Sequence, residues 1–445
     1  MKRILFKIFY LISPIILILA LWFTNPDNYS NPLILMTMIL GSVAYTWISL
    51  QFILSARPKF IEASFGMDKI YRFHGIMAVV AILFAIVHAL VNEQVIGESI
   101  ITTFGSGALV LFIIVSLLTM LTMSPSFILK YRPFKWLKKT IEGWKKFTYE
   151  QLRYIHNFTV VAFIVLNIHV LLTPNARDYV FIKILYISYF VISLSFYLYH
   201  KFIKPARLQN NKYLVAELVK ENNAVWTIKM KPTDKQLKKY NPGQFAFFSF
   251  KNDKQKFQEH PFSISSSPDD DHISITVKEL GDFTKTIGQF NVNDPALIEG
   301  PFGIFSYINH PKELETVFIV GGIGITPVMS MLKYMSKHDP ERKVLLIWGM
   351  NSMADQVAKE MFNEIAAQMK NLSIIPVISN DNTYPGEKGF IDQAMIQKLT
   401  NKVQINQNVA GYYVCGPTIL MDNSVAALSA LGVNKKRIHF EKFAL

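Results

Sequence analysis

Long apolar runs fill the first 200 residues of the chain, and charged loops separate them. Six of these runs approach the roughly 20 residues that a helix needs to cross a bilayer. The expected spans are 4–23, 33–54, 70–91, 104–123, 151–172 and 180–200. After residue 210 the apolar runs become short and change period, as in a soluble protein. The pattern predicts a six-helix transmembrane bundle over 1–205, followed by soluble domains.

The first run is also compatible with a cleaved signal peptide. No small-x-small cleavage site follows the stretch that ends at Phe23, so we expect it to remain as the first span. Lysine and arginine then predict the orientation. They crowd the N-terminus, the 55–69 and 124–150 loops and the end of span six, whereas the opposite loops contain one basic residue, Arg177. Positive charge marks the cytoplasmic side, so both termini and the soluble domains are expected in the cytoplasm, at the plasma membrane.

Four histidines lie inside two of the predicted spans, His74 and His88 in the third, His156 and His169 in the fifth. Ionisable side chains within a membrane are costly and usually functional. The two spans run in the same direction, which matches His74 with His156 in depth and His88 with His169. Fourteen helical residues rise about 20 Å, enough to stack two haems. We predict two b-type haems, each ligated by one histidine pair. The alternative is four buried histidines that form hydrogen bonds within the bundle.

The spacing within the fifth span is irregular for this prediction. Fourteen residues return a helix to within about 40° of the same face, but thirteen leave a difference of about 140°. Span five is therefore expected to be overwound, kinked, or to hold its haems on different flanks. Arg72 and Arg153 lie just inside their histidines, which suits either haem propionates or anchoring at the interface.

Composition narrows the classes of function. The chain is 51% hydrophobic with a mean hydropathy of +0.25 and a net charge of +14. Its basic residues are spread over membrane loops, so no nucleic-acid partner is expected. The single cysteine, Cys415, excludes a disulfide framework, a cysteine zinc site and an iron–sulfur cluster within this chain.

Short alternating runs at 213–220, 224–230, 243–250 and 272–280 predict an antiparallel β-barrel domain over 210–305. From residue 306 to 445, strands and helices alternate instead, which predicts an α/β doubly wound nucleotide-binding domain. Its first turn contains Gly321, Gly322 and Gly324, followed by Thr326 and Pro327 at a helix start. Glycines allow a backbone to approach a pyrophosphate, and a helix N-terminus favours anions.

Several motifs in these domains resemble the ferredoxin–NADP reductase superfamily, in its membrane branch of ferric reductases and NADPH oxidases. They are His260-Pro261-Phe262-Ser263, Lys278-Glu279-Leu280-Gly281-Asp282-Phe283-Thr284, Gly300-Pro301-Phe302-Gly303 and Cys415-Gly416-Pro417. The order and spacing of these motifs carry the resemblance, because each alone is weak.

The resemblance implies FAD and NAD(P)H as cofactors. Phe262 would lie against the isoalloxazine, Ser263 near its N5 and His260 near the phosphate or ribityl chain. The segment from Lys278 through Gly281 to Thr284 would hold the pyrophosphate, and the turn from Gly300 to Gly303 would join the two domains.

Further resemblances concern hydride transfer. Cys415, Gly416 and Pro417 would lie beside the nicotinamide; the alternative is a buried thiol before a turn. Phe443 matches the aromatic residue that covers the flavin in the family. The arginine that often follows the second strand and reaches the 2′-phosphate of NADPH is missing from Trp348-Gly349-Met350-Asn351. The choice between NADH and NADPH therefore stays open.

The resemblance implies a transmembrane oxidoreductase that passes electrons from cytoplasmic NAD(P)H through FAD and two haems to an external ferric chelate or dioxygen. One alternative is a membrane-anchored flavin reductase without haem that donates to quinone or a soluble partner. A channel or transporter with a regulatory nucleotide domain is disfavoured, since the bundle lacks the repeated halves of many transporters. The sequence predicts no oligomeric state.

Overall fold

The computed structural model describes residues 2–24, 30–95, 97–123, 154–209, 212–233, 239–252 and 257–441. The chain divides into two compact units, Met1–Lys204 and Pro205–Leu445.

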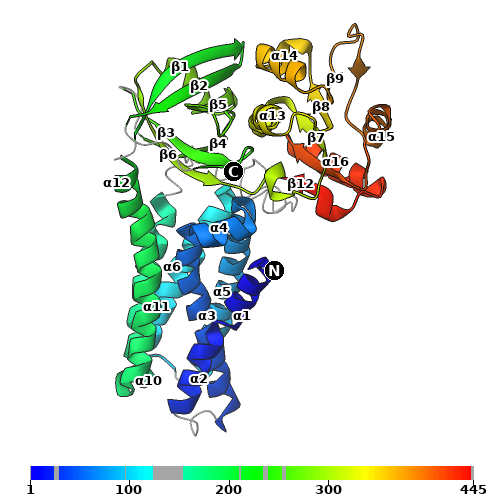
Figure 1. Cartoon of the computed structure of the whole chain (residues 1–445). Helices are drawn as coiled ribbons and strands as arrows, with labels where there is room; N and C mark the ends of the chain where they lie inside the picture. The colour runs from blue at the N-terminus through cyan, green and yellow to red at the C-terminus, as the bar shows by residue number, and fades with distance from the viewer. Residues whose placement is uncertain are drawn as a thin grey trace. The chain divides into compact units, whose positions relative to one another are not determined.

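The first unit is helical (Figure 1). Its helices are α1 (Lys2–Ile12), α2 (Pro14–Thr24), α3 (Pro32–Ser55), α4 (Lys59–Phe65), α5 (Met67–Val95), α6 (Ile100–Met123), α9 (Phe158–Leu172), α10 (Pro174–Asp178) and α11 (Val180–Leu198). A π-helical turn, η3 (Tyr199–Ile203), and α12 (Lys204–Gln209) follow.

Six helical stretches among the described residues are long and apolar enough to cross a membrane, as predicted. They are Ile4–Thr24, Pro32–Ser55, Lys69–Val95, Ile100–Thr119, Tyr154–Leu172 and Val180–Gln209. The first of them is interrupted at Ser13 because Pro14, which lacks a backbone N–H, begins α2.

The bundle packs α3 along α5, α6 along α9, and α11 against α3. Its interior contains a polar contact between three helices: the Tyr45 hydroxyl lies 2.8 Å from Asn167 Oδ1 and 2.9 Å from the Tyr186 carbonyl oxygen. Many large apolar side chains on the outside are exposed, including Leu83 on α5 and Ile114 on α6. An exposed apolar surface of this kind suits a lipid environment.

The second unit begins with an antiparallel sheet in the order β4-β3-β6-β1-β2-β5. The strands are β1 (Tyr213–Asn222), β2 (Val225–Pro232), β3 (Phe245–Phe250), β4 (His260–Ser263), β5 (Ile273–Lys278) and β6 (Pro295–Phe302). An antiparallel bridge between Ile264 and Ile275 joins the two edges. The sheet therefore closes into the predicted barrel.

A six-stranded sheet in the order β10-β9-β8-β7-β11-β12 follows, and its strand pairs are parallel. The strands are β7 (Glu315–Gly321), β8 (Val344–Met350), β9 (Leu372–Ile378), β10 (Glu387–Lys388), β11 (Ala410–Cys415) and β12 (Ile438–Phe440). The connecting helices are α13 (Thr326–His338), α14 (Lys359–Gln368), α15 (Gln393–Lys402) and α16 (Thr418–Ala430).

Side chains alternate across this sheet. Phe318 and Val320 of β7 pack with α13 and α14, whereas Val317 and Ile319 pack with α15 and α16, so each face has its own core (Figure 1). The chain moves outward from β7 through β8 and β9, and then returns to the other side of β7 as β11. That reversal is the point at which doubly wound folds bind their ligands.

Candidate functional site

The structure brings the two predicted histidine pairs together within the helical unit. The ring centres of His88 and His169 are 6.4 Å apart, with their planes at 74°. Those of His74 and His156 are also 6.4 Å apart, with their planes at 72°. Metal–imidazole bonds are about 2 Å long, so a metal ion held between two rings keeps their centres roughly 6 Å apart. Both pairs therefore fit a shared metal.

Neighbouring helices orient the pair His88 and His169, called the outer pair after its predicted side of the membrane; His74 and His156 are called the inner pair. His88 Nδ1 lies 2.9 Å from the Thr37 carbonyl oxygen on α3, and His169 Nδ1 lies 2.8 Å from the Ile101 carbonyl oxygen on α6. A carbonyl can only accept, so each Nδ1 carries the proton and each Nε2 is left unprotonated, as a metal ligand requires.

Two glycines make room for these rings. A Cβ added to Gly41 would lie 2.9 Å from His88 Cε1, and one added to Gly105 would lie 2.9 Å from His169 Cε1. Each glycine lies four residues, one helical turn, after the residue whose carbonyl binds the same imidazole. The sequence interpretation missed both glycines; their equal spacing from Thr37 and Ile101 could only be recognised once the helices were paired.

The inner pair is held less firmly. His156 Nδ1 lies 3.3 Å from the Thr119 hydroxyl of α6. His74 Nδ1 is buried, and no described residue offers it a hydrogen-bond partner. A buried ring nitrogen without a hydrogen bond is energetically costly. Hydrogen bonds therefore orient the inner histidines less strongly than the outer ones.

A tight turn at Asn157 accounts for part of the angular difference between His156 and His169. Here the Asn157 N–H donates to the Tyr154 carbonyl and the Val160 N–H to the Asn157 carbonyl, both three residues back. Such bonds turn the chain by about 120° per residue instead of 100°, so the helix is overwound at this point. The Tyr197 hydroxyl donates to Asn157 Oδ1 at 3.2 Å and fixes the turn.

The arginines expected just inside these histidines are placed only in part. Arg72 is exposed, and Arg153 lies outside the described residues. His200, in the π-helical turn after α11, accepts a hydrogen bond from Arg57 Nη2 at 3.0 Å.

The two expected flavin segments meet in the barrel. His260, at the start of β4, stacks on Phe283 with ring centres 3.7 Å apart and planes at 12°. Phe262 lies 6.2 Å from the same Phe283 ring. Pro261 and Ser263 complete β4, and Ser263 is buried. Phe283 therefore links the His260–Ser263 strand to the turn that follows β5, a role that the sequence interpretation did not give it.

The Leu280–Thr284 turn is organised by its own hydroxyl. Thr284 Oγ1 accepts the backbone N–H groups of Leu280 and Gly281, at 2.9 and 2.8 Å. These N–H groups were expected to bind a pyrophosphate. In this structure they donate to the Thr284 hydroxyl instead. Lys278 ends β5 beside this turn.

The Gly300–Gly303 turn requires glycine at two places. A Cβ on Gly300 would lie 2.7 Å from the Ala246 Cβ on β3. Gly303 has a φ of +91°, which other residues rarely adopt. The Gln244 side chain donates to the Gly303 carbonyl at 2.7 Å, which fixes the exit from the barrel.

The glycine turn after β7 and the Cys415-Gly416-Pro417 turn after β11 contact each other through their backbones. A Cβ on Gly324 would lie 2.6 Å from the Cys415 carbonyl oxygen, and one on Gly416 would lie 2.9 Å from Gly321 N. Gly322 has a φ of +51° and its carbonyl accepts the Trp348 indole N–H at 3.1 Å. Thr326 and Pro327 begin α13 and are buried.

Cys415 is completely buried. Burial, and then the nearby Glu441, raise the pKa of its thiol, so the thiol is neutral at physiological pH. This environment fits a small neutral side chain in a tight turn and does not support a thiolate nucleophile. Phe443, expected over the flavin, lies outside the described residues.

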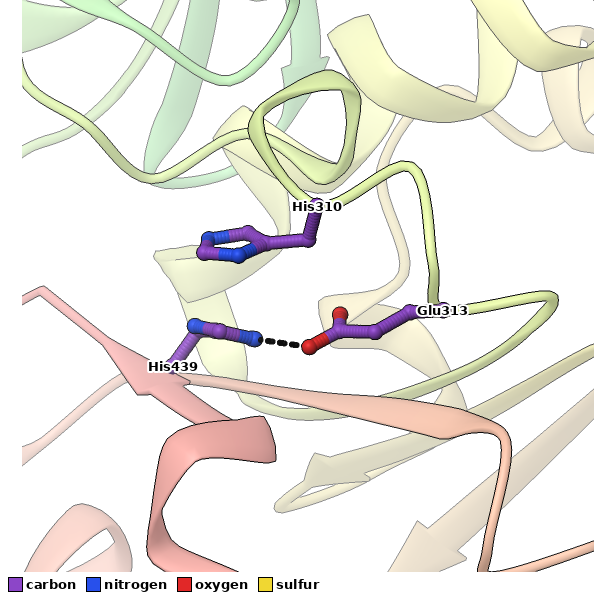
Figure 2. Close-up of side chains that lie close together, drawn as sticks. All are labelled: His310, Glu313 and His439. Carbon is purple, nitrogen blue, oxygen red and sulfur yellow. Dashed lines mark hydrogen bonds and ion pairs between the residues drawn. The ribbon is translucent and has the colours of Figure 1, made fainter.

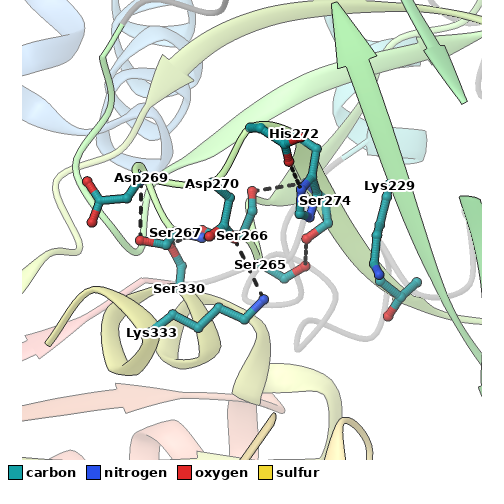
Figure 3. A network of polar contacts seen from close by, with 12 residues as sticks. Lys229, Ser265, Ser266, Ser267, Asp269, Asp270, His272, Ser274, Ser330 and Lys333 are labelled. Carbon is teal, nitrogen blue, oxygen red and sulfur yellow. Dashed lines mark hydrogen bonds and ion pairs between the residues drawn. The ribbon is translucent and has the colours of Figure 1, made fainter. Parts of the chain in front are cut away.

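A polar network lies between the barrel and α13 (Figure 3). The Ser330 hydroxyl donates to the Ser266 carbonyl at 2.6 Å, and Lys333 Nζ lies 3.9 Å from Asp270 Oδ2. Burial lowers the pKa of Lys333. These contacts hold the nucleotide domain against the flavin domain.

Three further residues form a group capable of binding a metal ion: the ligand atoms of His310, Glu313 and His439 lie within 4.8 Å of one another. The two imidazole rings are stacked, 3.8 Å apart, and His439 Nε2 lies 2.7 Å from Glu313 Oε1 (Figure 2). Stacked rings direct their in-plane nitrogens side by side and not at one point. We therefore interpret the group as an anchor between β12 and the segment before β7.

Comparisons with known proteins agree with this architecture. A model of the ferric reductase like transmembrane component matches residues 40–167, a FAD-binding domain matches 209–319, and an oxidoreductase NAD-binding domain matches 318–425. Together the three matches support a membrane NAD(P)H oxidoreductase, and they agree with the ferric reductase and NADPH oxidase-like family.

Curated relatives match the soluble part. A flavohemoprotein of Rhizobium meliloti (strain 1021) is 26% identical over 250 residues, which are 52% of this chain and 60% of the relative. The electron transfer component of a 2-halobenzoate 1,2-dioxygenase from Burkholderia cepacia is 27% identical over 46% of this chain and 58% of its own length. The chain thus spans less than two thirds of the curated relatives it matches. The FAD/NAD-binding domain of nitric oxide dioxygenase from Vibrio cholerae O1 biovar El Tor, a solved structure, matches 52% of this chain and 98% of its own, with 22% identity and a TM-score of 0.47.

Proposed function

We propose that this protein is a transmembrane oxidoreductase that takes electrons from NAD(P)H in the cytoplasm and delivers them, by way of FAD and two b-type haems, to an external ferric chelate or dioxygen. The proposal rests on two histidine pairs, His74 with His156 and His88 with His169. In each pair the ring centres are 6.4 Å apart. When bound, flavin exchanges an electron pair for single electrons and haem carries single electrons.

The side chains around the histidines fit haem better than a hydrogen-bonded cluster. In a bundle held by histidine–histidine bonds, ring nitrogens would face each other at hydrogen-bond distance. Here His88 and His169 instead direct Nδ1 to carbonyl oxygens of α3 and α6. Their Nε2 atoms would be the ones to hold a haem iron, which supports ligation by both residues.

In the soluble unit, the proposed roles follow the placement of the motifs. The stacked His260 and Phe283, with Phe262, offer an aromatic surface for the flavin. The adjoining turns at Gly321–Gly324 and Cys415–Pro417 lie at the switch point of the parallel sheet, where a dinucleotide would bind. The proposed domains are the transmembrane bundle over 1–205, the FAD-binding barrel over 210–305 and the nucleotide-binding domain over 306–445.

The proposed orientation, with both termini and the soluble domains on the cytoplasmic side of the plasma membrane, is supported by the distribution of lysine and arginine. Outward transfer of one electron is then favoured by about 2.3 kcal/mol for every 100 mV of inside-negative potential. The membrane potential would thus assist the reaction.

An anaerobic reduction experiment tests the proposal. Purified full-length protein, reconstituted with FAD, is mixed with NADH or NADPH and its absorption spectrum is followed. We expect b-type haem bands to become reduced, and to be reoxidised when a ferric chelate or oxygen is added. Nucleotide oxidation with an artificial acceptor but without haem bands would instead support the flavin reductase without haem.

A further inference from the structure

The loop after β8 occupies the position that reads the adenosine ribose of a bound dinucleotide. In doubly wound folds the pyrophosphate lies at the glycine turn after the first strand, and the end of the neighbouring strand contacts the ribose. Here Gly321–Gly324 follows β7, and β8 is the next strand in both the chain and the sheet. This inference rests on the proposed NAD(P)H site and concerns which dinucleotide it selects.

A carboxylate is fixed in that loop. Asp355 Oδ2 accepts the backbone N–H of Asn351 at 3.2 Å and that of Ser352 at 3.3 Å. The Ser352 side chain accepts the Asp355 N–H in return, which completes a capping box at the short 3₁₀ helix Met353–Asp355. Two N–H groups that a strand end would otherwise offer to an anion are therefore already bound to an anion of the protein.

This capping box also explains a difference from the sequence prediction. The alternation of strands and helices predicts a helix over about 354–370, but α14 begins at Lys359. Residues 351–358 form the capped turn instead, and Ala358 leaves it with a φ of +50°.

The end of β9 adds a second carboxylate beside the first loop. The Asn380 N–H donates to the Asn351 carbonyl at 2.9 Å, so the ends of β8 and β9 form one surface. Asp381 comes next, and hydrogen bonds from the hydroxyl and N–H of Thr383 hold its pKa below the usual value. Asp381 is therefore an anion at neutral pH.

Positive charge is scarce within the two segments themselves. Segments 351–358 and 379–386 contain neither lysine nor arginine. Of the flanking lysines, Lys359 begins α14, and Lys388 donates to the Asn382 carbonyl at 2.6 Å. A 2′-phosphate carries a charge near −2 at neutral pH and is normally bound by arginine or lysine.

We infer that this chain selects NADH over NADPH, with Asp355 as the specificity-determining residue. The carboxylate of Asp355 can accept a hydrogen bond from a ribose 2′-hydroxyl, whereas Asp355 and Asp381 together repel a 2′-phosphate. Selection thus comes from a repulsive group as well as from a missing attractive one.

Steady-state oxidation of NADH and NADPH by the full-length, FAD-reconstituted protein with an artificial acceptor tests the inference. We expect kcat/KM to favour NADH by about tenfold or more. Asn351→Arg should move the ratio toward NADPH by about tenfold, and Asp355→Asn should move it in the same direction. Glu364→Gln, an exposed acidic position on α14, serves as the matched control and should leave the ratio unchanged.

Ligand-induced thermal shifts give a second readout that does not depend on turnover. ADP should raise the melting temperature of the wild-type protein more than adenosine 2′,5′-bisphosphate does, and Asn351→Arg should reverse the order. Equal or better use of NADPH by the wild type, or a ratio that Asn351→Arg does not move, would overturn the inference. Oxidation of neither dinucleotide would overturn both this inference and the proposed function.

Discussion

His88 and His169 face each other from α5 and α9 with ring centres 6.4 Å apart, and each donates its Nδ1–H to a main-chain carbonyl of the helix packed behind it. The helices behind them, α3 and α6, provide equivalent surroundings: a carbonyl at Thr37 or Ile101, and a glycine one turn later. Two separate helix pairs therefore build matching halves of one site.

Gly41→Ala or Gly105→Ala should disrupt this outer site. The new Cβ would lie 2.9 Å from the imidazole Cε1 of His88 or His169, so the ring must move away from its carbonyl partner. Overpacking of this kind typically costs about 1–3 kcal/mol. We expect each variant to lose about one haem per chain, measured as the haem-to-protein ratio after purification.

Gly107→Ala on α6 and Gly75→Ala on α5 are the matched controls, because a Cβ at either position meets no atom of the described residues within 4 Å. Both should keep the wild-type haem content. If Gly41→Ala and Gly105→Ala also kept it, with unchanged spectra, the glycines would have no part in the site.

The anchor around Glu313 should make the soluble unit less stable in acid. Burial would raise the pKa of Glu313, but hydrogen bonds from His439 and Tyr413 outweigh it and hold that pKa below the usual value. A carboxyl with a lowered folded-state pKa stabilises the fold above its unfolded pKa, and this contribution disappears as the pH falls through the folded value. Burial also lowers the pKa of His310, so protonation of His310 opposes folding in the same direction.

Thermal melting between about pH 4 and 7 measures this effect. Glu313→Gln should lower stability at neutral pH by about 1–3 kcal/mol and flatten the loss of stability toward acid. Glu364→Gln, at an exposed position on α14, is the control and should leave the pH profile unchanged. A Glu313→Gln profile parallel to that of the wild type would refute the assignment.

Phe443 is predicted to gate nicotinamide access. The last described residue, Glu441, is buried and lies close to Gly303, so the tail leaves the nucleotide domain near the turn from the barrel. An offset aromatic contact is worth about 0.5–1.5 kcal/mol beyond area burial, which a nicotinamide ring can displace. Phe443→Ala should therefore tighten NAD(P)H binding and slow its release.

Dinucleotide titration and thermal melting of Phe443→Ala distinguish this role from a structural one. A core phenylalanine costs about 3–5 kcal/mol when truncated to alanine. A large fall in melting temperature with unchanged dinucleotide affinity would place Phe443 in the core and exclude the gate.

The sequence predicted the six spans, both sheets and the four histidines because each depends on a local period or on a residue type that is rare in its surroundings. Hydrophobic runs and alternation report directly on burial. The pairing of His74 with His156 could also be predicted from the sequence, because the number of spans and the charge of the loops determine which histidines lie at the same depth.

Contacts between distant segments could not be predicted in this way. The roles of Gly41 and Gly105 depend on which helix packs behind each histidine, and an isolated glycine in an apolar helix carries no signal for that. The tight turn at Asn157 depends on Tyr197. Likewise, the stacking of His260 on Phe283 depends on how β4 meets a turn twenty residues later.

The number of haems per chain tests the central claim most directly. Haem is quantified against protein in the purified full-length wild type and in four single variants, His74→Ala, His156→Ala, His88→Ala and His169→Ala. We expect about two haems per wild-type chain and about one in each variant, with the first two variants sharing one residual spectrum and the last two another. A wild-type ratio near one or zero would contradict the account.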